Sequence, residues 1–171
     1  MVDRSEDERT ASGSLKLARG ARVLIIESPY YADINAQLLK SAQAVLAENG
    51  CRADRVTVSG ALEIPQALAA AVTAGTIGAE GTLYDGAIAL GCVIRGETAH
   101  YDIVCNNANH WLMETAIRYS IPLGNAILTV DTREQALARA AGGAPSGKGG
   151  DAARACLGMI ALKQHFAETS A

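Results

Sequence analysis

An almost unbroken apolar run at residues 84–94 (YDGAIALGCVI) constrains the fold of this chain more than any other segment. A strand that is apolar along its whole length is typical of one that is buried on both faces. Such strands occur in parallel sheets, because the crossover helices of a parallel sheet cover both of its faces. The run therefore predicts a central strand of a parallel sheet.

Segments of strand character alternate with segments of helical period on both sides of this run. The other predicted strands are residues 22–27, 55–58 and 122–130, and the predicted helices are residues 34–46, 63–74, 133–141 and 151–166, with one more starting at about residue 102. Four βα units in series imply right-handed crossovers and helices on both faces of the sheet. We therefore predict an α/β fold, a three-layer sandwich around a four-stranded parallel sheet.

The length of 171 residues suits one domain. The first 20 residues carry mixed charges and lack the apolar stretch of a secretory signal, so we expect a flexible tail over residues 1–20 and a single domain over residues 21–171. No apolar run approaches the roughly 20 residues that span a bilayer. These features predict a cytoplasmic protein with no membrane partner.

The charge and the metal-ligand types narrow the function classes further. With 15 basic and 18 acidic residues the formal net charge is −3, which argues against a nucleic-acid partner. The four cysteines are widely spaced without a C-x-x-C pair, and the three histidines lack metal-ligand spacing. We expect free thiols and no metal site.

Large rings are scarce, with one Trp, one Phe and five Tyr, so their positions are informative. Trp111 shares a helical stripe with Val104 and Leu112, which predicts that it faces the core. Tyr30 and Tyr31 instead follow the strand at residues 22–27. Ligands of open α/β sheets bind beyond the carboxyl ends of the strands, so this pair is placed to stack on a planar ring.

The loop at residues 91–101 has the highest density of candidate functional groups. Gly96 leaves backbone amides accessible, Thr98 supplies a hydroxyl, and His100 stands just ahead of a helix. A helix N-terminus can hold a phosphate, and an imidazole titrates near neutral pH. His100 is thus a candidate for proton transfer, and the alternative is that it only caps or packs against the helix. Glu63, in the loop at residues 59–63, is similarly either a ligand or a capping acid.

Two signals of other chemistry are weak. Residues 142–149 (GGAPSGKG) resemble a phosphate-binding P-loop, but Gly149 stands where that motif needs Ser or Thr, and a predicted helix precedes it. Lys148 remains a candidate cationic contact, and Arg139 is the better phosphate ligand because a guanidinium binds oxygens in pairs. Cys92 is a possible nucleophile, yet a thiol inside an apolar strand is usually inert.

Four blocks of the sequence resemble, in order and at nearly the same spacing, the 6,7-dimethyl-8-ribityllumazine synthase family. They are residues 58–65 (VSGALEIP), 89–102 (ALGCVIRGETAHYD), 127–136 (ILTVDTREQA) and 148–153 (KGGDAA). The resemblance covers about residues 22–166, and the G-x-V-I-R-G-x-T-x-H block is the most specific part. It implies a flavodoxin-like fold.

The resemblance also implies a transferase of riboflavin biosynthesis that needs no cofactor. The 5-amino group of 5-amino-6-(ribitylamino)uracil condenses with the ketone of 3,4-dihydroxy-2-butanone 4-phosphate. An imine forms, phosphate is eliminated, and ring closure with loss of water gives the lumazine. The alternative is a catalytically weak paralogue that binds flavin or lumazine, and a third option is a flavodoxin-like regulatory domain.

Site roles follow from the resemblance position by position. Proton transfer is assigned to His100, and Lys148 with Asp151 forms a supporting charged pair near the phosphate. Phosphate binding is assigned to Glu97, Thr98 and Arg139, with Glu97 contributing through its backbone. Binding of the pyrimidine and ribityl groups is assigned to Tyr30, Ala61, Leu62, Glu63, Cys92, Val93, Ile94 and Asn125.

Asn125 stands where the family commonly has a Phe, and Asn107 replaces a frequent acidic residue. Asn125 lies near the start of the strand at residues 122–130, far from Tyr30 and His100, so only a neighbouring subunit's Asn125 is expected to reach their site. This agrees with the pentamers of the family, whose sites lie between subunits. Pentamers, decamers and icosahedral shells all remain open, and riboflavin synthase is a further suggested partner.

Overall fold

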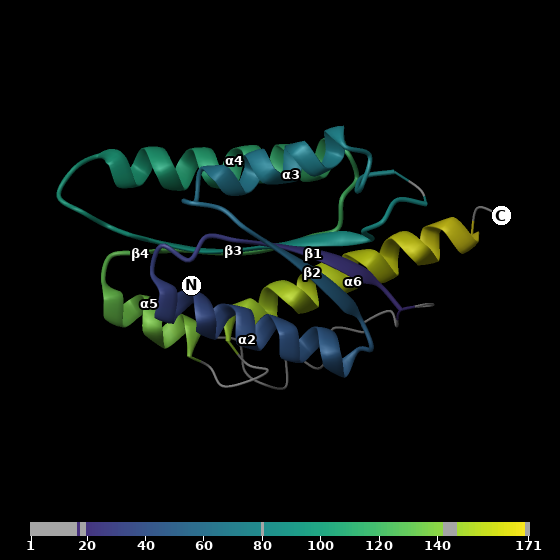
Figure 1. The fold of residues 1–171 in the computed structure, drawn as a ribbon, viewed down its shortest axis with the longest axis horizontal. Helices are drawn as coiled ribbons and strands as arrows, with labels where there is room; N and C mark the ends of the chain where they lie inside the picture. The colour runs from purple at the N-terminus through teal and green to yellow at the C-terminus, as the bar shows by residue number, and fades with distance from the viewer. Residues whose placement is uncertain (1–16, 18–19, 80, 142–146, 170–171) are drawn as a thin grey trace.

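The computed structural model describes residues 17, 20–79, 81–141 and 147–169. A four-stranded parallel sheet of order β2-β1-β3-β4 forms its middle layer (Figure 1). Helices α3 and α4 cover one face, and α2, α5 and α6 cover the other. The α/β prediction is therefore confirmed. The strands are β1 (Arg22–Glu27), β2 (Arg52–Thr57), β3 (Gly86–Ile94) and β4 (Leu123–Val130), and the helices are α2 (Ala32–Glu48), α3 (Glu63–Thr73), α4 (His100–Arg118), α5 (Arg133–Ala140) and α6 (Lys148–Thr169).

The core consists of two apolar clusters, one on each face of the sheet. β3 is buried from Gly86 to Cys92, as its sequence predicts for a strand between two others. The register pairs Glu27, the last residue of β1, with Leu90, so β3 continues for four residues beyond the end of β1. The loop that leaves β1 therefore starts beside the last part of β3.

Several predicted boundaries differ from the structure, and the starts of three elements are the most informative. β2 begins at Arg52 rather than residue 55, because its polar side chains lie on an exposed edge strand and carry no apolar signal. α4 begins at His100, two residues earlier than predicted. α6 begins at Lys148 rather than residue 151, so two glycines are helical.

Close packing explains one of those glycines, Gly149, and another glycine in β4. A Cβ on Gly149 would overlap the carbonyl oxygen of Leu38 in α2, and a Cβ on Gly124 would overlap that of Ala152 in α6. Gly149 and Gly124 thus let the backbones of α2, α6 and β4 approach more closely than any larger residue allows.

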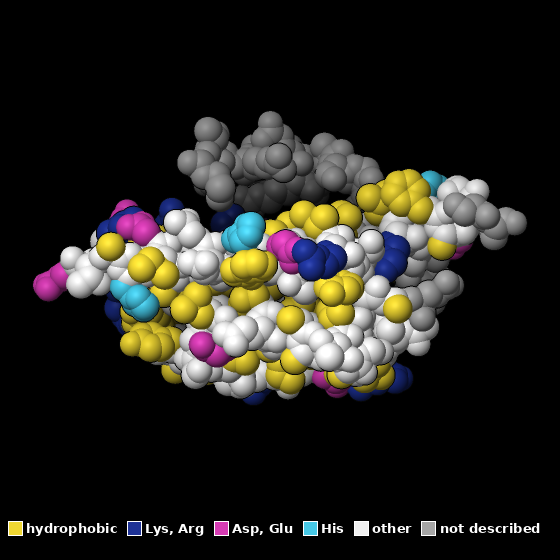
Figure 2. Space-filling model, turned by 90° about the horizontal axis from the view of Figure 1, so that it is seen from above, with side chains coloured by type: hydrophobic (Ala, Val, Ile, Leu, Met, Phe, Trp, Pro, Cys, Tyr) yellow, Lys and Arg dark blue, Asp and Glu magenta, His cyan; other side chains and the backbone are white. Residues whose placement is uncertain are grey.

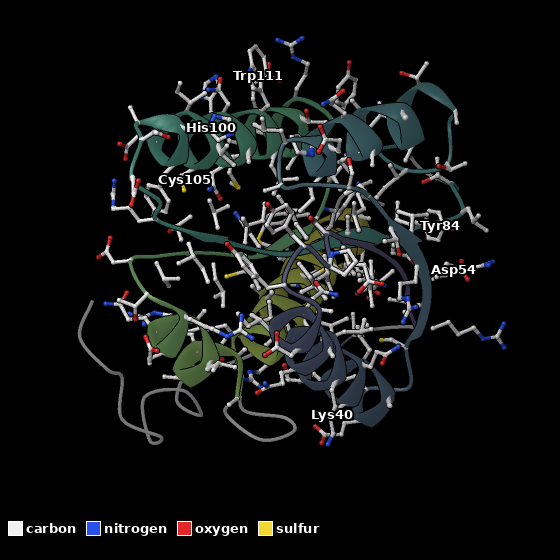
Figure 3. All side chains as sticks on the ribbon, turned by 60° about the vertical axis from the view of Figure 1, so that its left-hand side comes forward. Lys40, Asp54, Tyr84, His100, Cys105 and Trp111 are labelled. Carbon is white, nitrogen blue, oxygen red and sulfur yellow. The ribbon has the colours of Figure 1, made fainter. Side chains whose placement is uncertain are left out.

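The predicted burial of Trp111 was also wrong, since 52% of this side chain is exposed. Val104 and Leu112 are buried on the inner face of α4, while Trp111 projects from the outer side (Figure 3). One residue along a helix is a turn of about 100°, which is enough to separate Trp111 from Leu112.

The predicted tail falls largely outside the described residues. Within the described ranges, Leu17 packs against the core and Gly20 precedes β1. The division into a tail and one domain stays a prediction. No helix in this described part is both long and apolar enough to cross a membrane.

Candidate functional site

The loops that follow β1, β2 and β3 converge on one cavity of about 350 Å³. The three loops that the sequence singles out, residues 28–33, 59–63 and 91–101, all contribute to it. Of the predicted site residues, those that line the cavity are Tyr30, Ala61, Leu62, Glu63, Cys92, Val93, Ile94, Thr98 and His100. The site thus lies at the carboxyl edge of the sheet, the usual place for a ligand in this architecture.

Tyr30 presents its ring at the mouth of the cavity, where 72% of the residue is exposed. It meets Tyr31 edge to face, with ring centroids 5.1 Å apart. Tyr31 is half-buried against the core and also lines the cavity. One tyrosine therefore supports the other, which leaves the face of Tyr30 available for a planar ligand.

A buried carboxylate anchors the β1–α2 loop that carries these rings. Glu27, the last residue of β1, is 3% exposed. It accepts a hydrogen bond of 2.7 Å from Asn35 Nδ2 in α2 and forms an ion pair of 2.9 Å with Arg55 in β2. Buried charges need such partners. The start of α2 is thus tied to the ends of two strands.

The turn into α3 brings a carboxylate to the cavity. Glu63 is the first residue of α3, where the helix dipole favours a negative charge. A Cβ on Gly60 would lie 2.8 Å from Glu63 Oε2, so the glycine leaves room for this carboxylate. Gly60 also lines the cavity, and the sequence gave it no role beyond its place in the loop at residues 59–63.

Cys92, in the wall of the cavity, is a poor nucleophile. It is 7% exposed, and burial raises its pKa to about 11 because the thiolate loses its hydration. At neutral pH the group is therefore a protonated thiol. The nucleophile hypothesis loses its support, while a packing or binding role remains.

Alkylation tests this state of Cys92. With iodoacetamide at pH 7.5, we expect the half-exposed Cys51 to be modified first and Cys92 to remain unmodified, as measured by peptide mass spectrometry. Because the pKa is raised, the rate at Cys92 should grow as pH increases toward about 11. A Cys51→Ser variant provides the matched control, and rapid modification of Cys92 at pH 7.5 would contradict the argument.

The β3–α4 loop supplies the remaining cavity groups. His100 is the first residue of α4, it is exposed, and Figure 3 shows it at the start of that helix. Its backbone N–H donates to Thr98 Oγ1 at 3.4 Å. Gly96 and Tyr101 also line the cavity, and the sequence assigned no role to Tyr101. A helix N-terminus, a hydroxyl and an imidazole thus meet at one place, a combination suited to an anion and a proton transfer.

Several predicted residues lie away from this cavity. Arg139 is exposed on α5, where its guanidinium donates to the Gln135 carbonyl at 3.1 Å. Asn125 is exposed on the edge strand β4, donates to Asn109 Oδ1 at 2.7 Å, and accepts from the Ile127 N–H at 2.9 Å. Glu97 is exposed and is likewise not among the cavity-lining residues.

Lys148 and Asp151 form the predicted charged pair at the start of α6, 2.8 Å apart. Burial raises the pKa of the Asp151 carboxyl, but hydrogen bonds from Lys148 and Arg154 outweigh it and hold that pKa below its usual range. This pair too lies outside the cavity. Of the described residues that line the cavity, none is a lysine or an arginine, so a bound phosphate would need a cation from elsewhere.

The outer side of α4 exposes large apolar side chains. Figure 2 looks onto the layer of α3 and α4 and shows hydrophobic side chains spread over this face. The exposed large residues of α4 are Ile103, Trp111, Met113 and Ile117. Exposed apolar groups that gather on one face are typical of surfaces that bind other proteins.

Comparison with known proteins gives one answer. The model of the family described as 6,7-dimethyl-8-ribityllumazine synthase matches residues 20–164. A 6,7-dimethyl-8-ribityllumazine synthase of Methylorubrum populi is 47% identical over 96% of this chain and 95% of its own length. One from Rhodopseudomonas palustris, named 6,7-dimethyl-8-ribityllumazine synthase 1, is 50% identical over 87% of this chain and 90% of its own length.

Proposed function

Because this chain belongs to the 6,7-dimethyl-8-ribityllumazine synthase family, it is a lumazine-forming transferase of riboflavin biosynthesis, and we propose that the cavity described above is its substrate site. The observation that carries the proposal is the convergence of Tyr30, Glu63, Thr98 and His100 on one cavity. These side chains come from three separate loops and combine a ring, a carboxylate, a hydroxyl and an imidazole. That set matches the two substrates, a flat pyrimidine with a polyol chain and a small phosphate ester.

The pyrimidine substrate occupies the part of the cavity near Tyr30. The exposed Tyr30 ring stacks on the uracil, and residues 61–63 receive the ribityl chain. The strand end at residues 92–94 reads the edge of the ring through its backbone, which needs no particular side chain. Cys92 therefore contributes its backbone and the shape of its side chain to the cavity wall, and no reactive group.

The phosphate ester lies at the start of α4. Thr98 and the backbone of residues 96–97 bind the phosphate, with the Glu97 carboxylate pointing to solvent. The amino end of α4 adds its partial positive charge. Arg139 of a neighbouring copy supplies the cation that the cavity of one chain lacks, and Lys148 with Asp151 supports it.

His100 moves the protons of the reaction. The 5-amino nitrogen attacks the ketone, and loss of one water gives the imine. Removal of a proton from the neighbouring carbon then expels phosphate and leaves an enol, which tautomerises to a ketone. The ribitylamino nitrogen attacks this ketone and closes the second ring with loss of another water. One imidazole beside the phosphate serves these steps, and much of the rate comes from holding the two substrates together.

The site is shared between subunits. Members of this family form homo-oligomers, and we propose pentamers in which Asn125 and Arg139 of one subunit face the cavity of the next. The exposed positions of both residues and the apolar outer side of α4 support this arrangement. The four free thiols fit a cytoplasmic location, and riboflavin synthase, which would consume the product, is the proposed partner enzyme.

Subunit mixing tests the shared site. His100→Ala and Arg139→Ala should each be nearly inactive alone, while co-expressed mixed oligomers should recover about one quarter of wild-type activity, because one site in four then combines an intact His100 with a neighbour's intact Arg139. Lumazine absorbance measures turnover. No recovery on mixing would mean that both residues act within one subunit, and no turnover by the wild type would leave a binding protein only.

A further inference from the structure

One arginine outside the proposed substrate contacts joins both ends of the loop that carries His100. Arg95 directly follows β3. Its Nε donates to Asp131 Oδ1 at 2.9 Å, and its terminal nitrogens lie 3.4 Å from the Asp102 carboxylate in the first turn of α4. Its guanidinium also stacks on the Tyr101 ring, 4.0 Å from the centroid. One side chain thus bridges the start of the loop, the end of the loop and the end of β4.

The loop between these anchor points has little packing of its own. Residues 95–100 are all exposed. The two ends of this segment are better held, since the Arg95 N–H donates to the Val130 carbonyl at 2.9 Å and Tyr101, the residue that follows, is half-buried against Thr129 and Cys105. The shape of residues 96–100 therefore depends on contacts that close the loop from outside.

The ion pairs of Arg95 are too exposed to contribute much to the stability of the fold. Its side chain is 45% exposed, and those of Asp131 and Asp102 are 64% and 56% exposed. Exposed ion pairs add little to the free energy of unfolding. A fork-shaped guanidinium does, however, fix direction as well as distance, which suits a residue that shapes a loop.

The same contacts have an electrostatic consequence. Asp102 and Asp131 place two negative charges next to the loop that would receive a phosphate. Arg95 lies between them and compensates part of that charge. Its position keeps the carboxylates turned to the guanidinium instead of toward the anion.

We propose that Arg95 is a positioning residue, which holds residues 96–100 in the shape that keeps Thr98 and His100 at the cavity without touching substrate itself. This inference rests on the proposed function, because it concerns the same site. Arg95 does not line the cavity, whereas Thr98, His100 and Tyr101 do.

Steady-state kinetics of Arg95→Gln test the inference. We expect kcat to fall about 30-fold and the KM for the phosphate ester to rise, because displacing reacting groups by about 1 Å costs up to about 100-fold. The KM for the pyrimidine should stay within about twofold, because Tyr30 and residues 61–63 belong to other loops. Arg95→Lys, which keeps the charge but loses the fork, should recover part of kcat.

Asp131→Asn separates positioning from direct binding of phosphate. A positioning role predicts a fall in kcat and a rise in the KM for the phosphate ester, both smaller than in Arg95→Gln. The reason is that the guanidinium loses only its shortest contact. If Arg95 bound phosphate directly, removing a competing carboxylate would instead lower the KM for the phosphate ester. A lower KM in Asp131→Asn would therefore overturn the inference.

Arg22→Gln is the matched control. Arg22 pairs with Asp54 at 2.7 Å and stacks on Tyr84, and Figure 3 shows Asp54 and Tyr84 far from His100. Arg22→Gln should leave kcat and both KM values near wild type. If Arg95→Gln gave the same kinetic constants as Arg22→Gln, the inference would be overturned. Unchanged turnover by His100→Ala would overturn the proposed site. Wild-type turnover by Arg95→Gln, together with reduced turnover by His100→Ala, would overturn only the positioning role of Arg95.

Discussion

His100→Ala is expected to lower kcat by about 100-fold, which corresponds to about 2.7 kcal/mol of lost transition-state stabilisation. Imine formation, phosphate elimination and ring closure each move a proton, and the described residues lining the cavity include one imidazole. The loss should remain partial, because holding two substrates together supplies much of the rate. Stopped-flow absorbance of the lumazine product measures it.

Binding should survive this change. The variant should bind a substrate analogue with an affinity within about threefold of wild type, since Tyr30, Glu63 and Thr98 are intact. His165→Ala is the matched control, because His165 is exposed near the end of α6 and should leave turnover unchanged. A kcat equal to wild type in His100→Ala would refute its role in proton transfer.

Gly124→Ala is expected to lower the free energy of unfolding by at least about 3 kcal/mol, or the melting temperature by at least about 6 °C. The added Cβ would overlap the carbonyl oxygen and carbon of Ala152. Both contacts are backbone atoms, so β4 or α6 must move as a whole. Thermal unfolding followed by circular dichroism at one fixed protein concentration measures the change, because oligomers are stabilised by mass action.

Gly158→Ala is the control for this packing argument. Gly158 is exposed in α6, the helix that Gly124 contacts, and a Cβ on Gly158 would meet nothing within 4 Å. Alanine is the better helix former by about 1 kcal/mol, so this variant should be slightly more stable than wild type. Equal destabilisation by both changes would show that close packing is not the cause.

Much of the fold was predictable because its signals are local. The apolar run that became β3 indicated a strand buried on both faces, and the alternation of strands and helices indicated a parallel sheet. The carboxyl-edge rule then pointed to the three loops that converge on the cavity. Errors occurred where local signals were weak, at the polar edge strand β2 and at the glycines that begin α6.

Much of the site was predictable too, although the sequence did not show that Arg139 lies apart from the cavity of its own chain. Tyr30, Glu63 and His100 each follow or begin an element whose position the sequence indicates. The residues around Arg139 do not indicate which cavity it faces. Only the structure shows that Arg139, on α5, does not line the cavity of its own chain. Tyr101 and Gly60 lie in loops that the sequence singled out, but they received no role because their neighbours held the recognisable chemistry.

The sequence determined the fold class, the order of the elements and the loops that hold chemistry, because periodicity and turn residues act over a few neighbours. Tertiary structure was needed for everything that joins distant segments. Arg95 reaches Asp131 across 36 positions, Gly124 meets Ala152, and Trp111 turns outward while Leu112 packs inward. Such contacts depend on strand order, register and helix rotation, which arise when the whole core packs and which no short stretch of residues encodes.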